Sequence, residues 1–213
     1  AIDYATNEDI ARAREFVLVD ASGIEWLPPQ VPPSALVEVI DHRFIGNPAK
    51  LFPSAKICVE RVGAAATIIV ERFQKAQIKP TLASSEMLYG AIHSNTQCLK
   101  GSITDARDRA ASAWLEARHS LSSTLLDRQF EARKREITAD IETALTRERK
   151  TVQHPSGAYA VAQFEFWGAV RYFYENRKFF IRAVPALSPR TMLNMVDLKT
   201  GGSLLFIPDI ALC

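Results

Sequence analysis

Cysteine is scarce in this sequence, and its spacing excludes two kinds of protein. The 213 residues contain three cysteines, Cys58, Cys98 and Cys213, which are odd in number and far apart. No two of them have the Cys-x-x-Cys spacing of a zinc site, and three dispersed thiols do not make a disulfide framework. This cysteine usage suits a reducing compartment, so we expect a cytoplasmic protein.

Strong charge and long apolar runs are also lacking. The formal net charge of +2 is too small to indicate binding to nucleic acid or to an anionic membrane. No stretch approaches the roughly 20 uninterrupted apolar residues that a membrane-spanning helix needs. With 47% hydrophobic and 23% charged residues, the composition is that of a globular protein with one large or two small domains.

The first half of the chain alternates short apolar strands with amphipathic helices. Residues 15–20 (EFVLVD) and 36–41 (LVEVID) predict two strands, and the four prolines between them predict an extended loop. The spacing of apolar residues predicts helices over 61–77, 81–92 and 104–119. This alternation is typical of an α/β fold with a mostly parallel sheet and flanking helices.

The composition changes after residue 120. Residues 121–151 are rich in charges of both signs and predict a helical linker. Over 152–213, a strand, a helical segment and a Lys-Thr-Gly-Gly-Ser turn between apolar runs predict a smaller mixed α/β domain that closes with a β-hairpin. We therefore expect a first domain over 1–120, the linker, and a second domain over 152–213. The aromatic residues over 164–180 are spaced for a core rather than for stacking on bases.

The two predicted strands end in side chains that could bind a metal. Asp20 ends the first strand, and Asp41, His42 and Arg43 end the second, at what would be one edge of a parallel sheet. Carboxylate and imidazole ligands suit Mn²⁺ or Mg²⁺, and a guanidinium suits phosphate oxygens. Structural alternatives stay open at this point, because an Asp after a strand often caps a turn and an Asp–His pair can be purely structural.

Six segments in the right order resemble the DHH phosphoesterases, in the branch of manganese-dependent inorganic pyrophosphatases, exopolyphosphatases and prune-like proteins. Segments 17–22 (VLVDAS) and 38–45 (EVIDHRFI) look like that family's second and third motifs, the latter in its Asp-His-Arg form. Residues 60–73 resemble the helix that follows the third motif, and residues 89–115 resemble the fourth motif. Residues 147–166 resemble the entry to the family's second domain, and residues 194–208 resemble its closing hairpin. The resemblance implies a two-domain, metal-dependent hydrolase.

The same resemblance implies roles for individual residues. The implied metal ligands are Asp20, His42 and Asn95, and the implied catalytic residues are Asp41, Arg43 and Lys150. Asp41 would orient its neighbour His42, while Arg43 and Lys150 would bind the phosphates of the substrate. The implied cofactor is Mn²⁺ or Mg²⁺, as two ions.

Two departures from the family pattern affect these expectations. Asn95 stands where the family has a metal-binding Asp, so one metal site would be weaker; His93 would be either a substitute ligand or an ordinary helix residue. The family's opening motif, a strand with a His and two Asp ligands, is absent. Its loss would leave a gap inside the sheet, so we expect that the chain is incomplete.

The expected function is hydrolysis of a phosphoanhydride, pyrophosphate or short-chain polyphosphate, by a metal-activated water. The expected partner is a small phosphorylated substrate, and we expect no binding to nucleic acid or to a membrane. The sequence is compatible with an oligomer. The alternative is a degenerate, non-catalytic DHH-like module for phosphate binding or protein interaction. Cleavage of a nucleotide phosphodiester is a third option, disfavoured because Gly201 and Gly202 are better explained by the hairpin turn than by a substrate cradle.

Overall fold

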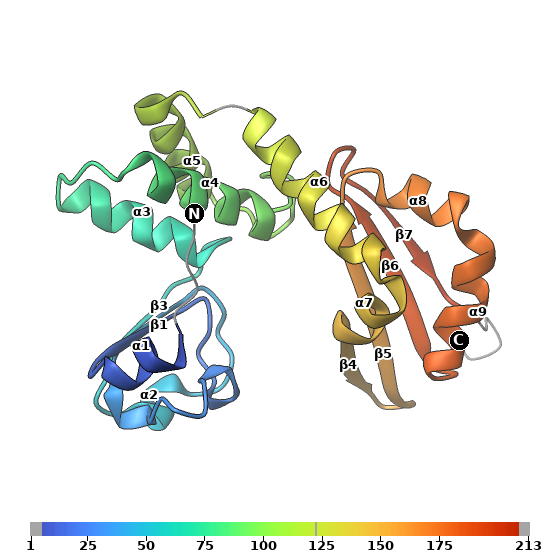
Figure 1. Cartoon of the computed structure of the whole chain (residues 1–213), viewed down its shortest axis with the longest axis horizontal. Coiled ribbons are helices and arrows are strands. Elements are labelled where there is room, and N and C mark those ends of the chain that lie inside the picture. The colour runs from blue at the N-terminus through green and yellow to red at the C-terminus, as the bar shows by residue number, and fades with distance from the viewer. Residues whose placement is uncertain (1–5, 122, 209–213) are drawn as a thin grey trace. The chain divides into compact units, whose positions relative to one another are not determined.

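The computed structural model describes residues 6–121 and 123–208 of the chain. The chain divides into two compact units, Ala1–Leu121 and Ser122–Cys213, and each has its own sheet (Figure 1). The predicted fold class is confirmed: the first unit contains a parallel sheet with helices, and the second contains a mixed sheet with helices.

The sheet of the first unit has three strands, β1 (Phe16–Val19), β2 (Leu36–Asp41) and β3 (Lys56–Val59). They lie in the order β1-β2-β3, and both pairs are parallel. The first two strands were predicted, whereas β3 was missed because its sequence, KICV, is short and begins with lysine. The parallel arrangement places the carboxyl ends of all three strands at one edge of the sheet.

The described residues of the first unit form the helices α1 (Asn7–Arg12), α2 (Pro48–Leu51), α3 (Ala65–Lys75), α4 (Leu82–Asn95) and α5 (Ala106–His119). The proline-rich loop between β1 and β2 was expected to be extended. It contains two short 3-10 helices, η1 (Ile24–Trp26) and η2 (Pro33–Ala35). Proline favours the first turn of such a helix because its φ is already suitable and its missing N–H needs no partner there.

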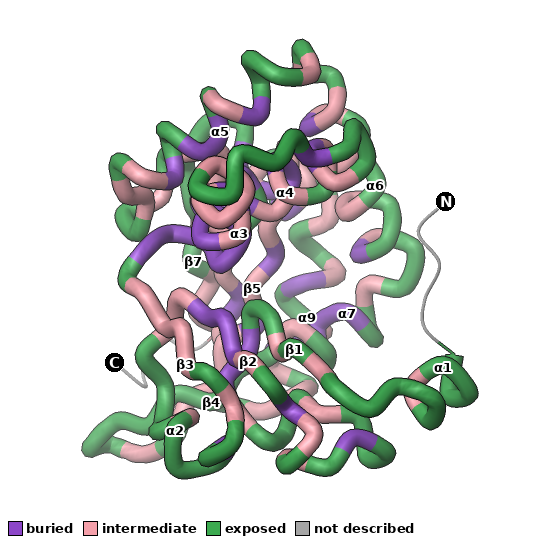
Figure 2. Tube along the Cα trace, turned by 90° about the vertical axis from the view of Figure 1, so that its left-hand side faces the viewer, coloured by how far each residue is buried: buried purple, intermediate pink, exposed green. Residues whose placement is uncertain are grey.

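Apolar side chains of β2 pack on both faces of the sheet. Neighbouring side chains of a strand point to opposite faces, so Val39 and Ile40 belong to different clusters. Val39 packs with Phe52, whereas Ile40 packs with Val62 and with Ile68 of α3. Figure 2 shows β2 and the beginning of α3 as largely buried. The strand that carries Asp41 is therefore held firmly from both sides.

Within the described residues, β1 lies at an open edge of this sheet. It pairs with β2 on one side, and the side chains of Val17 and Val19 on it are 50% and 46% exposed. The sequence led us to expect a gap inside the sheet. That expectation is wrong for the described strands, because β1, β2 and β3 are consecutive hydrogen-bonded neighbours.

The chain makes a left-handed turn directly after α4. Gln97, Cys98 and Leu99 have φ values of 50°, 57° and 60°, although none of them is glycine. Each such residue costs about 1–2 kcal/mol relative to a right-handed conformation. The turn is held by the Leu99 N–H, which donates to Thr96 Oγ1 at 3.1 Å, and by the Arg109 guanidinium, which donates to the Leu99 carbonyl at 2.8 Å.

The second unit is built on a mixed sheet in the order β4-β5-β6-β7. Its strands are β4 (Arg149–His154), β5 (Gly157–Phe166), β6 (Thr191–Asp197) and β7 (Gly202–Phe206). The pair β5–β6 is parallel and the other two pairs are antiparallel, so the predicted closing hairpin is present as β6 and β7.

The described helices of the second unit are α6 (Ser123–Ala139), α7 (Ile141–Arg147), α8 (Ala169–Glu175) and α9 (Arg177–Leu187). Aromatic residues such as Phe164 and Phe180 are fully buried in the core of this unit. The segment 121–151 was expected to be a helical linker. Its residues Ile137 and Leu145 lie in the same core, so α6 and α7 pack against the second sheet.

No helix among residues 6–121 and 123–208 combines the length and the apolar character that crossing a membrane requires.

Candidate metal centre

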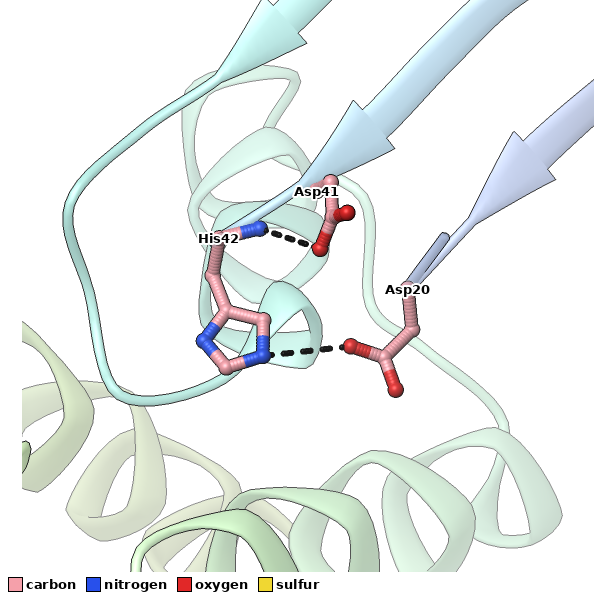
Figure 3. A group of neighbouring side chains, drawn as sticks. All are labelled: Asp20, Asp41 and His42. Atoms are coloured by element: carbon pink, nitrogen blue, oxygen red, sulfur yellow. Dashed lines mark hydrogen bonds and ion pairs between the residues drawn. The ribbon is translucent and has the colours of Figure 1, made fainter. Parts of the chain in front are cut away.

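The carboxyl ends of β1 and β2 bring three candidate metal ligands together (Figure 3). Asp20 follows β1, Asp41 is the last residue of β2, and His42 follows it. One ligand atom from each side chain lies within 4.8 Å of the others. In the part of the chain that the structure describes, this is the one group of three or more His, Cys, Asp or Glu side chains so arranged.

Asp20 is placed by a turn of the backbone at the end of β1. Its φ of 59° lies in the left-handed region, which Asp adopts more readily than most other residues. Its N–H still donates to the Ile40 carbonyl at 2.9 Å and so continues the ladder between β1 and β2. The half-exposed carboxylate then points toward His42.

The imidazole of His42 is held at both of its nitrogens. Nδ1 lies 3.1 Å from the Val62 carbonyl oxygen, which can only accept, so this nitrogen carries a proton. Nε2 lies 3.3 Å from Asp20 Oδ1. The hydrogen bond to Asp20 raises the pKa of His42 above its usual value, although burial opposes the shift. In its neutral form the ring presents the Nε2 lone pair to the space that it shares with Asp20.

Asp41 is buried and its carboxylate is already engaged. Oδ1 accepts from the backbone N–H of His42 at 2.8 Å, from that of Arg43 at 3.3 Å and from the Arg43 Nε at 3.2 Å. Burial raises the pKa of Asp41, but hydrogen bonds from Ser22 and His42 and the charge of Arg43 outweigh burial and lower it. Asp41 is therefore ionised and fixes the backbone that carries His42.

Arg43 lies beside the same carboxylates. Its guanidinium donates to the Asp20 carbonyl and to Asp41 Oδ1, and Nη2 lies 3.6 Å from Asp20 Oδ1. The side chain is 38% exposed, so part of the guanidinium faces solvent next to the candidate ligands. A cation in this place can bind an anionic ligand that enters the centre.

These residues fit a divalent cation of the Mn²⁺ or Mg²⁺ kind. Carboxylate oxygen together with imidazole nitrogen suits Mn²⁺ and related transition metals, and carboxylate alone suits Mg²⁺. Asp20 and His42 are the better ligands, because Asp41 Oδ1 is occupied by three donors. Three side chains supply fewer atoms than octahedral coordination of one ion needs, so water or an anionic ligand would complete it.

Asn95 makes its observed side-chain hydrogen bond inside its own helix. It is the last residue of α4, and its Nδ2 donates to the Ala91 carbonyl at 3.2 Å. Nearby His93 is buried, with Nε2 3.0 Å from Ser112 Oγ on α5, and burial lowers its pKa. His93 therefore faces the contact between α4 and α5 rather than acting as a substitute ligand in this conformation.

Lys150 lies in the second unit. It is an exposed residue of β4 and is paired with Val161 of β5. Of the six predicted site residues, the structure thus groups four, Asp20, Asp41, His42 and Arg43, around the carboxyl ends of β1 and β2.

Sequence reasoning missed two residues that hold this centre. The hydroxyl of Ser22 supports the charged form of Asp41, and the carbonyl of Val62 fixes the His42 ring. The sequence contained only a weak indication of the role of Ser22, since it stands two residues after Asp20 at the start of the loop predicted to be extended. The role of Val62 could not be recognised in the sequence, because the contact is made by a backbone carbonyl, which every residue has.

The chain is similar in sequence to a pyrophosphatase, although no protein-family model matches it. Over 152 residues, 70% of this chain, it is 28% identical to a Thermotoga maritima protein named "Probable manganese-dependent inorganic pyrophosphatase". The match covers 28% of that protein, so the chain spans well under two thirds of its relative's length.

The fold is similar to that of a solved structure from Methanococcus jannaschii, a "putative family II inorganic pyrophosphatase". The two agree with a TM-score of 0.60 over 94% of this chain and 76% of that one, at 18% sequence identity. The resemblance to the pyrophosphatase branch of the DHH phosphoesterases is thus confirmed, in sequence by the first protein and in fold by the second.

Proposed function

We propose that this protein is a metal-dependent phosphohydrolase that cleaves a phosphoanhydride, either pyrophosphate or short-chain polyphosphate. The observation that carries the proposal is the group of Asp20, Asp41 and His42 at the sheet edge, with Arg43 beside it. The name of the Thermotoga maritima relative, a manganese-dependent inorganic pyrophosphatase, supports both the substrate and the cofactor.

In this proposal Asp20 and His42 bind the cation, as Mn²⁺ or Mg²⁺. When bound, a divalent cation activates a water for attack on phosphorus and neutralises charge on the phosphoryl oxygens. His42 keeps its proton on Nδ1, which donates a hydrogen bond to the Val62 carbonyl, and leaves Nε2 available. Asp41 keeps His42 and Arg43 in place by accepting both of their backbone N–H groups.

Arg43 and Lys150 bind the phosphates of the substrate. Arg43 offers a planar fork that matches two phosphoryl oxygens, and the exposed ammonium of Lys150 offers a mobile point charge. We assign metal binding to the first domain, where Arg43 also contributes to substrate binding, and the other substrate contacts to the second domain. Two ions would require ligands beyond the described group, and Asn95, with a neutral carbonyl oxygen, is the proposed ligand for one of them. We also propose that the protein acts in a reducing compartment such as the cytoplasm.

A second candidate is a phosphate-binding module without catalysis. It is favoured by the small number of side-chain ligands in the described group and by the uncharged Asn95. Such a module needs the cations Arg43 and Lys150, but it does not need a metal that activates water.

Phosphate release from pyrophosphate and from tripolyphosphate, with added Mn²⁺ or Mg²⁺, separates the two candidates. Asp20→Asn is the informative variant, because Asn tolerates the left-handed φ of 59° and the substitution removes only the charge. We expect metal-dependent release that falls by at least about 100-fold in Asp20→Asn. The matched control is Asp140→Asn, which makes the same change at an exposed residue that caps α7. Phosphate binding without release at any metal concentration would exclude the hydrolase and leave the module.

A further inference from the structure

A fully buried carboxylate lies in α5, outside the group of candidate ligands. Asp108 has no exposed surface, and its two oxygens accept hydrogen bonds from three donors. Oδ2 accepts from the Asp105 N–H at 2.7 Å and from the Gly63 N–H at 2.8 Å, and Oδ1 accepts from the Thr67 hydroxyl at 2.5 Å. A buried carboxylate is costly unless hydrogen bonds of this kind compensate for its loss of water.

Capping of α5 explains only one of these bonds. The bond from Asp105 belongs to a capping box, in which the third residue of a helix accepts from the residue that caps it. The donors Gly63 and Thr67 lie 45 and 41 residues away in sequence, just before α3 and in its first turn, respectively. Asp108 therefore also fixes a loop that helix capping does not require.

Gly63 is packed directly against this carboxylate. A Cβ atom at this position would lie 2.5 Å from Asp108 Oδ2 and 2.7 Å from Thr96 Cγ2. Such distances are well inside van der Waals contact, so any side chain at position 63 would displace the loop. The glycine is thus explained by the close approach of its backbone to Asp108.

The N–H of Gly63 and the carbonyl of Val62 belong to the same peptide group. That group is trans and planar, so its N–H and its C=O point in opposite directions. On one side Asp108 accepts the N–H at 2.8 Å, and on the other side the carbonyl lies 3.1 Å from His42 Nδ1. One rigid peptide therefore joins a buried carboxylate to the imidazole, and hydrogen bonds in such a chain strengthen one another.

We infer that Asp108 is a positioning residue for His42 and acts through the peptide group between Val62 and Gly63. Its negative charge polarises this peptide and makes the carbonyl a stronger acceptor, which keeps the His42 proton on Nδ1 and directs Nε2 to Asp20. Carboxylates that hold metal-binding histidines directly raise their basicity and fix their orientation, and here a peptide stands between the two groups. The relevance to metal binding rests on the proposed function, whereas the effect on the His42 ring does not.

Asp108→Asn is the direct test, because an amide of the same size cannot accept from Gly63, Asp105 and Thr67 as the carboxylate does. In the metal-free protein, long-range ¹H–¹⁵N NMR reports which nitrogen of the neutral His42 ring is protonated. His42→Gln identifies its signals among the four histidines. We expect the Nδ1-protonated form to dominate in the wild type and a mixture of both forms in Asp108→Asn. Mn²⁺ binding, followed by the EPR signal of the free ion, should weaken about 10-fold.

A matched control separates positioning from a general loss of stability. Asp197 in the second unit is also a buried carboxylate, and its Oδ1 accepts from the N–H groups of Gly168, Lys199 and Thr200. Asp197→Asn should lower stability without changing the His42 protonation pattern or Mn²⁺ affinity. If Asp108→Asn behaves in the same way as this control, the inference is overturned.

A milder pair of variants keeps the test decisive if Asp108→Asn does not fold. Thr67→Val removes one donor to Asp108, and Thr67→Ser retains it. We expect Thr67→Val to shift the protonation pattern of the His42 ring in the same direction as Asp108→Asn does. Thr67→Ser should keep the wild-type pattern. A wild-type pattern in Thr67→Val would refute the inference. If the wild type does not bind Mn²⁺, the proposed function fails, and the NMR comparison still decides the role of Asp108.

Discussion

His42 Nε2 lies 3.3 Å from Asp20 Oδ1, although the two residues follow different strands and are separated by a proline-rich loop. Without a metal, the Asp20 carboxylate can accept a hydrogen bond from Nε2 when His42 is protonated. A bound cation would take both ligand atoms and replace this contact, so protonation of His42 and metal binding compete for the same nitrogen.

The first prediction concerns the titration of His42. Its pKa is raised, mainly by the hydrogen bond to Asp20, above the value of about 6.5 that it has in the unfolded chain. Protonated His42 therefore adds stability that is fully present below about pH 6.5 and is lost as the pH rises through the folded pKa. NMR of the metal-free protein should show a His42 midpoint above about 6.5, and Asp20→Asn should lower it.

The matching stability measurement is urea unfolding of the metal-free protein between about pH 5.5 and 8.5. His42→Gln should remove part of the decrease in unfolding free energy over this range, whereas His154→Gln, at an exposed residue of β4, should not. Mn²⁺ should bind more weakly as the pH falls, because the proton must leave Nε2 first. A His42 midpoint at or below 6.5 would contradict the prediction.

The second prediction concerns Asp41 at acid pH. Its pKa is lowered, so its ionised form adds stability above the unfolded value of about 3.9, and that stability is lost as the pH falls through the folded pKa. Asp41→Asn should lower the free energy of unfolding by about 1–3 kcal/mol at neutral pH. The reason is that an amide accepts less well than the buried carboxylate from the backbone N–H groups of His42 and Arg43. Urea unfolding at pH 3–7 measures both effects.

The control for Asp41 is Asp9→Asn. The pKa of Asp9 is also lowered, by its hydrogen bonds with Thr6, but this carboxylate is exposed. Its substitution should change the unfolding free energy much less. Equal decreases in unfolding free energy in the two variants would show that burial of Asp41 does not increase its contribution to stability.

The third prediction concerns Arg43. Arg43→Lys keeps the charge but removes the planar fork that contacts the Asp20 carbonyl and Asp41 Oδ1. We expect the KM for pyrophosphate to rise about 10-fold, which corresponds to the loss of one charged hydrogen bond. Steady-state kinetics should be compared with those of Arg171→Lys, where an exposed arginine pairs with Glu175. An unchanged KM in Arg43→Lys would remove Arg43 from the substrate-binding residues.

The fourth prediction concerns Gly63. In Gly63→Ala the new methyl group meets Asp108 and Thr96 at 2.5 and 2.7 Å, and such overpacking costs about 1–3 kcal/mol. In Gly202→Ala the nearest atom, Thr200 Oγ1, would be 3.4 Å away, so this control should unfold almost as the wild type does. Thermal unfolding of both variants checks the difference, and a stable Gly63→Ala would show that the loop can shift freely.

The group at the sheet edge could be predicted because it depends on local features. A short apolar strand followed by Asp can be recognised in the sequence. Parallel strands bring their carboxyl ends to the same edge of the sheet, independently of the conformation of the loops between them. Asp20, Asp41 and His42 therefore meet as the strand ends indicated.

Contacts that depend on the packing of distant segments could not be predicted in this way. Gly63, for example, is packed against Asp108, which lies 45 residues later on α5. Arg43 was expected to bind phosphate, and its additional contacts with Asp20 and Asp41 were not predicted. No periodicity or local spacing encodes such partners.

The left-handed turn over residues 97–99 has a consequence for the evolutionary record of this protein. Three successive residues there occupy a region of φ and ψ that β-branched side chains enter only with strain. Substitution by Val, Ile or Thr should therefore be purged by selection at each of these positions, whereas Asn and Gly should be accepted. A set of homologous sequences should show this substitution pattern even where the side chains themselves have diverged.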